Sequence, residues 1–176
     1  MPITPDTKDW TWVLERPCAE CGFDAATGSP TEVPELIRRN AAAWPAVLDR
    51  PEVQRRPNGS TWSPLEYSAH VRDVFRLARI RLSLMLDEPD PMFANWDQDE
   101  TAETERYNEQ DPAVVAVDLV DEAELLAKEL AAVEEEQWTR RGRRSDGAVF
   151  TVASFAVYIV HDPIHHLWDV TDRRET

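Results

Sequence analysis

Four long segments of this chain carry apolar residues at three- and four-residue spacing, and this periodicity constrains the fold more than any other feature. Such spacing places apolar side chains along one face of an α-helix. The helices are predicted over residues 31–48, 64–87, 111–136 and 151–170. The sequence has 5 glycines among 176 residues, too few for the many tight turns of an all-β fold. We therefore expect an all-α protein, a four-helix bundle with a long crossover between helices 2 and 3. A non-bundle all-α domain is the alternative.

The second predicted helix has the clearest start signal in the sequence. Ser63 is suited to the N-cap, Pro64 to the first helical position and Glu66 to the third, which together make a capping box. The fourth predicted helix is apolar almost all round, which indicates a central position in the bundle. Pro45 and Pro163 lie inside predicted helices, where proline removes a backbone hydrogen bond and kinks the helix.

The chain divides into two regions. Residues 1–30 form an irregular N-terminal segment that contains a C-x-x-C motif, and residues 31–176 form the bundle domain. The crossover at 87–110 is polar and acidic, and a connection of this length either covers a site or is a solvated loop with a few anchoring aromatics. Part of it, around 99–109, could be helical. The segment 139–147 contains four arginines and is predicted to be a turn. These arginines are either exposed linker charges or hold an anion.

The charge balance excludes several classes of partner. The net charge of -15 would repel a phosphate backbone, so we expect no nucleic-acid partner. No apolar stretch approaches the roughly 20 residues that a membrane-spanning helix needs, so we expect no membrane partner. The N-terminus lacks the basic and apolar regions of a secretory signal. These features predict a cytoplasmic protein that acts on a small-molecule substrate.

The chain has two cysteines, Cys18 and Cys21, in the sequence PCAECG. Two cysteines are too few for a zinc site built from four. A thioredoxin-like role would need the motif to open a helix behind a strand, and no such unit is predicted. The favoured interpretation is a packed turn with reduced thiols. The alternatives are a local disulfide, a redox role and, least favoured, a partial metal site that borrows a histidine.

All four histidines lie on predicted helices. His161 and His165 are four residues apart, so their side chains project side by side, as two ligands of one metal do. His70 lies on the second helix and is the natural third ligand, which would leave an open coordination position for water or substrate. His166 is rotated by about 100° from His165 around the helix, so it is not predicted as a metal ligand. It would line the pocket or bond to Asp162.

Two carboxylates are placed to support these imidazoles. Asp73 follows His70 by three residues, and Asp169 follows His165 by four. Each is a candidate to orient a metal-bound histidine or to act as a general base, and hence a candidate catalytic residue. Each histidine taken alone would more often be an ordinary core or surface residue. The candidate pocket-wall aromatics are Trp62, Trp96, Trp168 and Tyr107.

Two segments resemble the DinB/YfiT-like superfamily of metal-dependent enzymes: TWSPLEYSAHVRDVFRLARIRL and HDPIHHLWDV. The resemblance covers residues 31–172 and implies a four-helix bundle whose metal ligands are His70, His161 and His165. It also implies Zn2+ or Ni2+ in an open site and a homodimer. The entry segment TWVLERPCAECGFD resembles the start of an actinobacterial branch. The chain departs from the common pattern at Pro163 and at LWDV, where many members have a glycine-glutamine pair.

The superfamily includes mycothiol-dependent maleylpyruvate isomerase and thiol S-transferases. The resemblance therefore implies a metal-dependent transferase or isomerase that uses a low-molecular-weight thiol, such as mycothiol, as cosubstrate. In such an enzyme the metal lowers the pKa of the thiol. The alternatives are a metal-dependent hydrolase that uses metal-bound water and a non-catalytic metal-binding or stress-response module.

Overall fold

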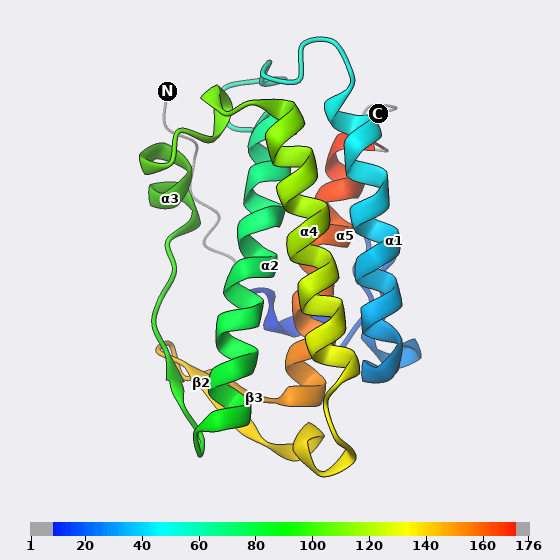
Figure 1. Cartoon of the computed structure of the whole chain (residues 1–176), viewed down its shortest axis with the longest axis vertical. Helices are drawn as coiled ribbons and strands as arrows, with labels where there is room; N and C mark the ends of the chain where they lie inside the picture. Colours follow the sequence, from blue (N-terminus) through cyan, green and yellow to red (C-terminus); the bar gives the residue numbers. More distant parts are fainter. Residues whose placement is uncertain (1–8, 172–176) are drawn as a thin grey trace.

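Four long helices run side by side in the computed structural model, which describes residues 9–171 (Figure 1). They are α1 (Val33–Leu48), α2 (Pro64–Asp87), α4 (Pro112–Ala131) and α5 (Val152–Thr171). Helices α4 and α5 each pack against both α1 and α2. The predicted four-helix bundle with its long crossover between the second and third bundle helices is therefore confirmed.

The start of α2 follows the predicted signal. The Ser63 hydroxyl accepts a hydrogen bond from the Glu66 backbone N–H, and the Glu66 carboxylate accepts one from the Ser63 backbone N–H at 2.8 Å. Helix α4 is capped by the Asp111 side chain, which accepts from the Ala113 backbone N–H. This helix ends at Ala131, earlier than predicted, and a 3-10 helix (Glu135–Thr139) follows it.

The crossover is partly helical around 99–109, as the sequence suggested, but the crossover and the arginine-rich turn also contain strands that the sequence does not predict. The crossover contains β1 (Met92–Phe93), α3 (Gln98–Thr104) and a 3-10 helix (Tyr107–Glu109). Strands β2 (Arg141–Arg144) and β3 (Val149–Thr151) form a hairpin where a simple turn is predicted, and β2 also pairs in parallel with β1.

Glycine is required in β2 because this strand passes close to the core. A Cβ atom on Gly142 would lie 2.6 Å from Cζ of Phe93 and 2.8 Å from Cγ of Met85. The non-local pairing of β1 with β2 depends on this close approach, which local sequence patterns do not reveal.

The described part of the N-terminal segment, residues 9–30, lies against α5. It contains three short 3-10 helices, Trp10–Leu14, Ala25–Thr27 and Pro30–Glu32. Val13 is fully buried, and Leu14 and Phe23 pack against the bundle core. This arrangement places the C-x-x-C motif next to the helix that carries three of the four histidines.

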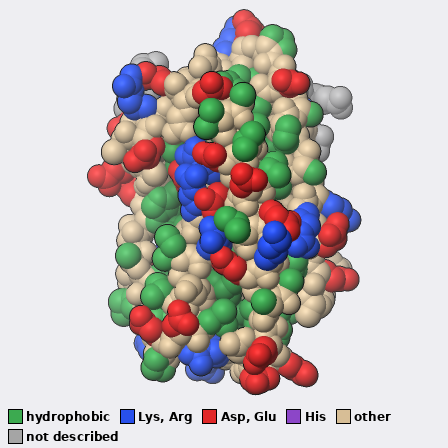
Figure 2. All heavy atoms as spheres, viewed as in Figure 1, with side chains coloured by type: hydrophobic (Ala, Val, Ile, Leu, Met, Phe, Trp, Pro, Cys, Tyr) green, Lys and Arg blue, Asp and Glu red, His purple; other side chains and the backbone are tan. Residues whose placement is uncertain are grey.

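Acidic and basic side chains are interspersed on the face of the bundle that includes α4, as Figure 2 shows. No histidine is visible on this face. Within the described residues, no helix is both long enough and apolar enough to cross a membrane.

Candidate functional site

Two groups of metal-ligand side chains lie next to each other at α5. In each group, one ligand-type atom from every residue lies within 4.8 Å of those of the other members. The first group, hereafter the histidine–aspartate group, is His70, Asp162 and His166. The second, hereafter the cysteine–histidine group, is Cys18, Cys21, His161 and His165.

Helix α5 supplies both groups from adjacent faces. Residues four apart on a helix share a face, and consecutive residues are rotated by about 100°. The pair Asp162 and His166 therefore faces α2, where His70 lies, whereas the pair His161 and His165 faces the N-terminal segment. Adjacent residues on α5 therefore belong to different groups.

The three members of the histidine–aspartate group converge on one point. His70 Nε2 lies 3.3 Å from Asp162 Oδ1, and His166 Nε2 lies 3.7 Å from the same oxygen. Two ligands of a tetrahedral zinc ion, each about 2.1 Å from the metal, are about 3.4 Å apart. The separations and the donor types therefore fit a divalent metal ion.

Aromatic rings surround this group. The Trp96 ring stacks on His70 with 5.3 Å between centroids and 9° between planes, and the Trp62 ring lies 5.1 Å from His70. The Tyr67 ring lies 4.8 Å from His166. Since His70 is fully buried, these rings keep bulk water from one side of the group.

Asp169 orients His166. Its carboxylate accepts a hydrogen bond from His166 Nδ1 at 3.0 Å, so the lone pair of His166 lies on Nε2, the atom that faces Asp162. This carboxylate–histidine arrangement is the usual support of a metal-bound imidazole. Asp169 also lies 4.0 Å from His165 Nε2, the histidine that it was predicted to support.

The Asp162 carboxylate is charged at neutral pH. Burial alone would raise its pKa, but the electrostatic interactions with the His166 and His70 imidazoles and the hydrogen bond with His70 lower it by more than burial raises it. A charged carboxylate between two imidazoles suits a cation better than it suits an apolar ligand.

The cysteine–histidine group is held by a turn before α1. Cys18 Sγ lies 3.6 Å from His165 Nδ1, and His165 Nε2 lies 3.3 Å from a Glu20 carboxylate oxygen. His161 Nε2 is buried and has no hydrogen-bond partner among the described residues. Burial raises the pKa of the Cys21 thiol to about 12 and lowers the pKa of His161 to about 4.

The predicted ligands are thus divided between the two groups. The structure brings His161 and His165 together, but it groups His70 with Asp162 and His166. Neither Asp162 nor His166 was among the predicted ligands. Their four-residue spacing was the available signal, and it is the same spacing that His161 and His165 have.

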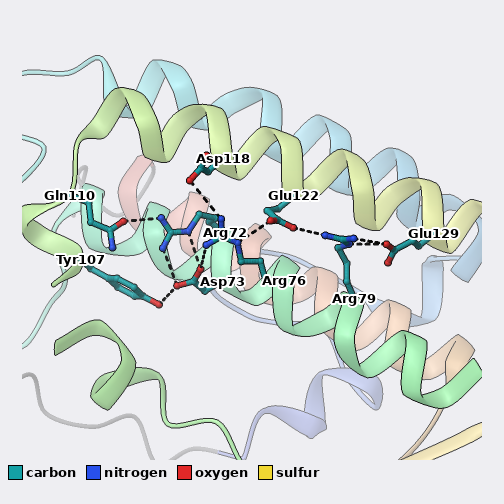
Figure 3. Close-up of polar contacts among 9 residues, drawn as sticks. All are labelled: Arg72, Asp73, Arg76, Arg79, Tyr107, Gln110, Asp118, Glu122 and Glu129. Atoms are coloured by element: carbon teal, nitrogen blue, oxygen red, sulfur yellow. Dashed lines mark hydrogen bonds and ion pairs between the residues drawn. The ribbon is translucent and has the colours of Figure 1, made fainter. Parts of the chain in front are cut away.

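Asp73, a predicted catalytic residue, lies in a polar network between α2 and α4 (Figure 3). It accepts hydrogen bonds from Arg72 at 2.9 Å, from Arg76 at 3.1 Å and from the Tyr107 hydroxyl at 2.5 Å. Burial raises the pKa of Asp73, but these hydrogen bonds and the arginine charges lower it by more. These contacts join the Asp73 carboxylate to two arginines of α2 and to Tyr107 of the crossover, so they are structural.

A cavity of about 410 Å³ adjoins both groups. Asp162 and His166 from the first group and His161 and His165 from the second line it. Of the predicted aromatics, Trp96 lines it. Its other lining residues include Trp10, Arg81, Arg144 and Tyr158.

Comparisons with known proteins agree with this architecture. A family model described as the DinB superfamily matches residues 35–170. The solved structure of YfiT from Bacillus subtilis superposes with a TM-score of 0.65 at 17% identity, over 99% of this chain and 94% of that chain. YfiT is described as a probable metal-dependent hydrolase with an unusual four-helix bundle topology. Among curated protein sequences, none matches this chain.

Proposed function

Since this chain belongs to the DinB superfamily, we propose that it is a metal-dependent enzyme acting on a small molecule in the cavity beside α5. The observation that carries the proposal is the convergence of His70, Asp162 and His166. Two of these three side chains line the cavity, and all three donor atoms lie within 4.8 Å of one another.

In this proposal, His70, Asp162 and His166 hold a divalent transition metal. Two imidazoles and a carboxylate are a donor set that Zn2+ and Ni2+ accept, and three protein ligands are typical of catalytic rather than structural zinc sites. When bound, the metal would supply Lewis acidity, which lowers the pKa of a water molecule or a thiol. This set replaces the His70, His161 and His165 set that the family resemblance implied.

Residues of the chain itself prepare the cavity for catalysis. Asp169 fixes the orientation of His166, and Trp62 and Trp96 exclude water from the His70 side. Rigid support of this kind keeps ligands in the geometry that the reaction needs.

Two arginines and four aspartates line the cavity, and one of the arginines, Arg81, is placed to bind an anionic group of the substrate. Arg81 Nε is buried without a hydrogen-bond partner among the described residues, and burial lowers the pKa of this side chain. Arg144 also lines the cavity, where it donates to the Tyr158 hydroxyl at 2.8 Å and pairs with Asp146. A carboxylate or similar anion on the substrate would satisfy Arg81.

Two reaction classes fit this arrangement. The first is transfer or isomerisation with a low-molecular-weight thiol such as mycothiol, because the cavity borders the metal ligands and admits a small molecule. The second is hydrolysis, which the likeness to YfiT favours. Turnover of anionic electrophiles with and without added thiol separates the two classes.

Metal analysis of tag-free protein tests the proposed ligands. We expect His70→Ala, Asp162→Ala and His166→Ala each to lose the same single equivalent of metal and all activity, with helical content by circular dichroism unchanged. Asp121→Asn, at an exposed position of α4, is the control and should keep both. Unchanged metal content in His166→Ala would exclude His166 as a ligand. A metal-loaded wild type without turnover on any substrate would favour a binding module.

A further inference from the structure

We propose that Cys18, Cys21, His161 and His165 form a second, closed zinc site that holds the N-terminal segment on α5. This inference goes beyond the proposed function, because it concerns a different set of residues and a structural role. Two thiolates and two imidazoles are a common donor set for structural zinc, and four protein ligands leave no open position for a substrate.

The backbone around the two cysteines brings their thiols together. The Gly22 N–H donates to the Cys18 carbonyl at 2.9 Å, and the Cys18 N–H donates to the Phe23 carbonyl at 2.8 Å. Gly22 has a φ of 73°, a conformation that residues with a Cβ atom rarely adopt. This turn therefore aims both sulfur atoms at the same point on α5.

Each of the two imidazoles presents a ring nitrogen to this site. Glu20 lies 3.3 Å from His165 Nε2, so His165 Nδ1 remains for a ligand bond, and it is the atom that lies 3.6 Å from Cys18 Sγ. A carboxylate on the remote nitrogen is the usual partner of a metal-bound histidine. His161 Nε2 is a buried polar atom without a hydrogen-bond partner among the described residues. A metal ion would satisfy it.

The surroundings favour a metal over a disulfide or a redox pair. A disulfide between Cys18 and Cys21 would leave His161 Nε2 unsatisfied, and buried polar atoms rarely lack a partner. Redox C-x-x-C motifs are activated at a helix N-terminus, whereas this motif lies between two 3-10 helices. The donor atoms of four residues within 4.8 Å of one another are better explained by a shared cation.

The site has a consequence for the cavity. The Trp10 ring lies 5.5 Å from the His161 ring and 5.2 Å from the His165 ring, and it also lines the cavity. A zinc ion bound by the cysteine–histidine group would hold this part of the N-terminal segment in place. We therefore assign this zinc site the role of fixing one wall of the cavity.

X-ray absorption spectroscopy of the zinc-loaded wild type tests the site without any mutation. The expected zinc spectrum contains sulfur neighbours at about 2.3 Å together with nitrogen neighbours at about 2.0 Å. Replacing zinc by Co2+ should produce thiolate-to-cobalt charge-transfer absorption and the intense visible bands of a tetrahedral site. Zinc-loaded protein without sulfur neighbours would overturn the proposal.

Variants then distinguish this site from the histidine–aspartate group. Cys21→Ser and His161→Ala should each lose one equivalent of zinc and the charge-transfer band, and keep the metal held by His166. His166→Ala is the matched control and should lose the other equivalent but keep the band. If the band persists in Cys21→Ser, the proposal is wrong. If His166→Ala loses no metal while the band behaves as expected, the proposed function fails and this inference stands.

Discussion

At the scale of single residues, neighbouring side chains on α5 belong to different groups. His161 faces the cysteines of the N-terminal segment, and Asp162 faces His70 on α2. The same offset separates His165 from His166. Each group also has its own supporting carboxylate, Glu20 for His165 and Asp169 for His166.

The contact between Asp169 and His166 gives a prediction at this scale. Asp169→Asn keeps the size of the side chain but removes the charge that orients the imidazole. We expect the metal affinity of the histidine–aspartate group to fall by about 10- to 100-fold. Competition with a chromophoric chelator measures it, and the thiolate-to-cobalt band should not change. An affinity equal to that of the wild type would mean that Asp169 does not support a ligand.

At the scale of elements, ion pairs join α2 to α4. Arg76 pairs with Glu122 at 3.0 Å, and Arg79 pairs with Glu122 at 2.8 Å and with Glu129 at 2.8 Å, as Figure 3 shows. Asp73 and the buried Tyr107 extend this network to the crossover. Burial raises the pKa of Glu122, but the hydrogen bonds and charges of Arg76 and Arg79 lower it further.

This network predicts how stability depends on pH. Asp73 and Glu122 have pKa values below their ordinary values in the folded protein, so they bind protons more readily in the unfolded chain. Their stabilisation is complete above the unfolded pKa values, about 4, and is lost as the pH falls through the lower folded values. Urea unfolding between pH 7 and pH 3 should therefore show a falling free energy of unfolding at the acidic end.

The variant Asp73→Asn checks the source of that effect. It leaves the Arg72 guanidinium, 7% exposed, without its carboxylate partner, and should cost about 2–3 kcal/mol at pH 7. Its loss of stability on acidification should be smaller than that of the wild type. Equal slopes in the two proteins would assign the acid sensitivity to other groups. Metal content and turnover should not change, which would separate Asp73 from metal binding and from catalysis.

At the scale of the whole molecule, the N-terminal segment and the bundle meet at the two groups. The segment contributes two thiols and Trp10, and α5 contributes two imidazoles and the next wall of the cavity. Removal of zinc from the cysteine–histidine group should therefore loosen the segment while the four bundle helices persist.

Limited proteolysis measures this loosening. Glutamyl endopeptidase should cleave after Glu15 or Glu20, both exposed, about tenfold or more faster after chelation, a change of about 1.4 kcal/mol in local stability. Restoring Zn2+ should restore protection in the wild type and not in Cys21→Ser. Cleavage that is equally fast with and without zinc would mean that the segment is held by apolar packing alone.

The sequence by itself determined the bundle and identified histidines of α2 and α5 as candidate metal ligands, but not Asp162. Apolar spacing and the capping box at Ser63 specify the helices locally, because helix periodicity and capping depend on neighbours within a few residues. The hairpin β2–β3 was missed, because its parallel partner β1 is about 50 residues away and Gly142 is needed only where the strand meets Phe93.

Only the tertiary structure decided how the ligands are grouped. Two pairs on α5, His161 with His165 and Asp162 with His166, have the same four-residue spacing, so the sequence cannot rank one above the other. The rotation of α5 against α2 turns the second pair towards His70, and the turn at Gly22 brings the cysteines to the first. Helix rotation is fixed by packing between distant segments, which no local pattern contains.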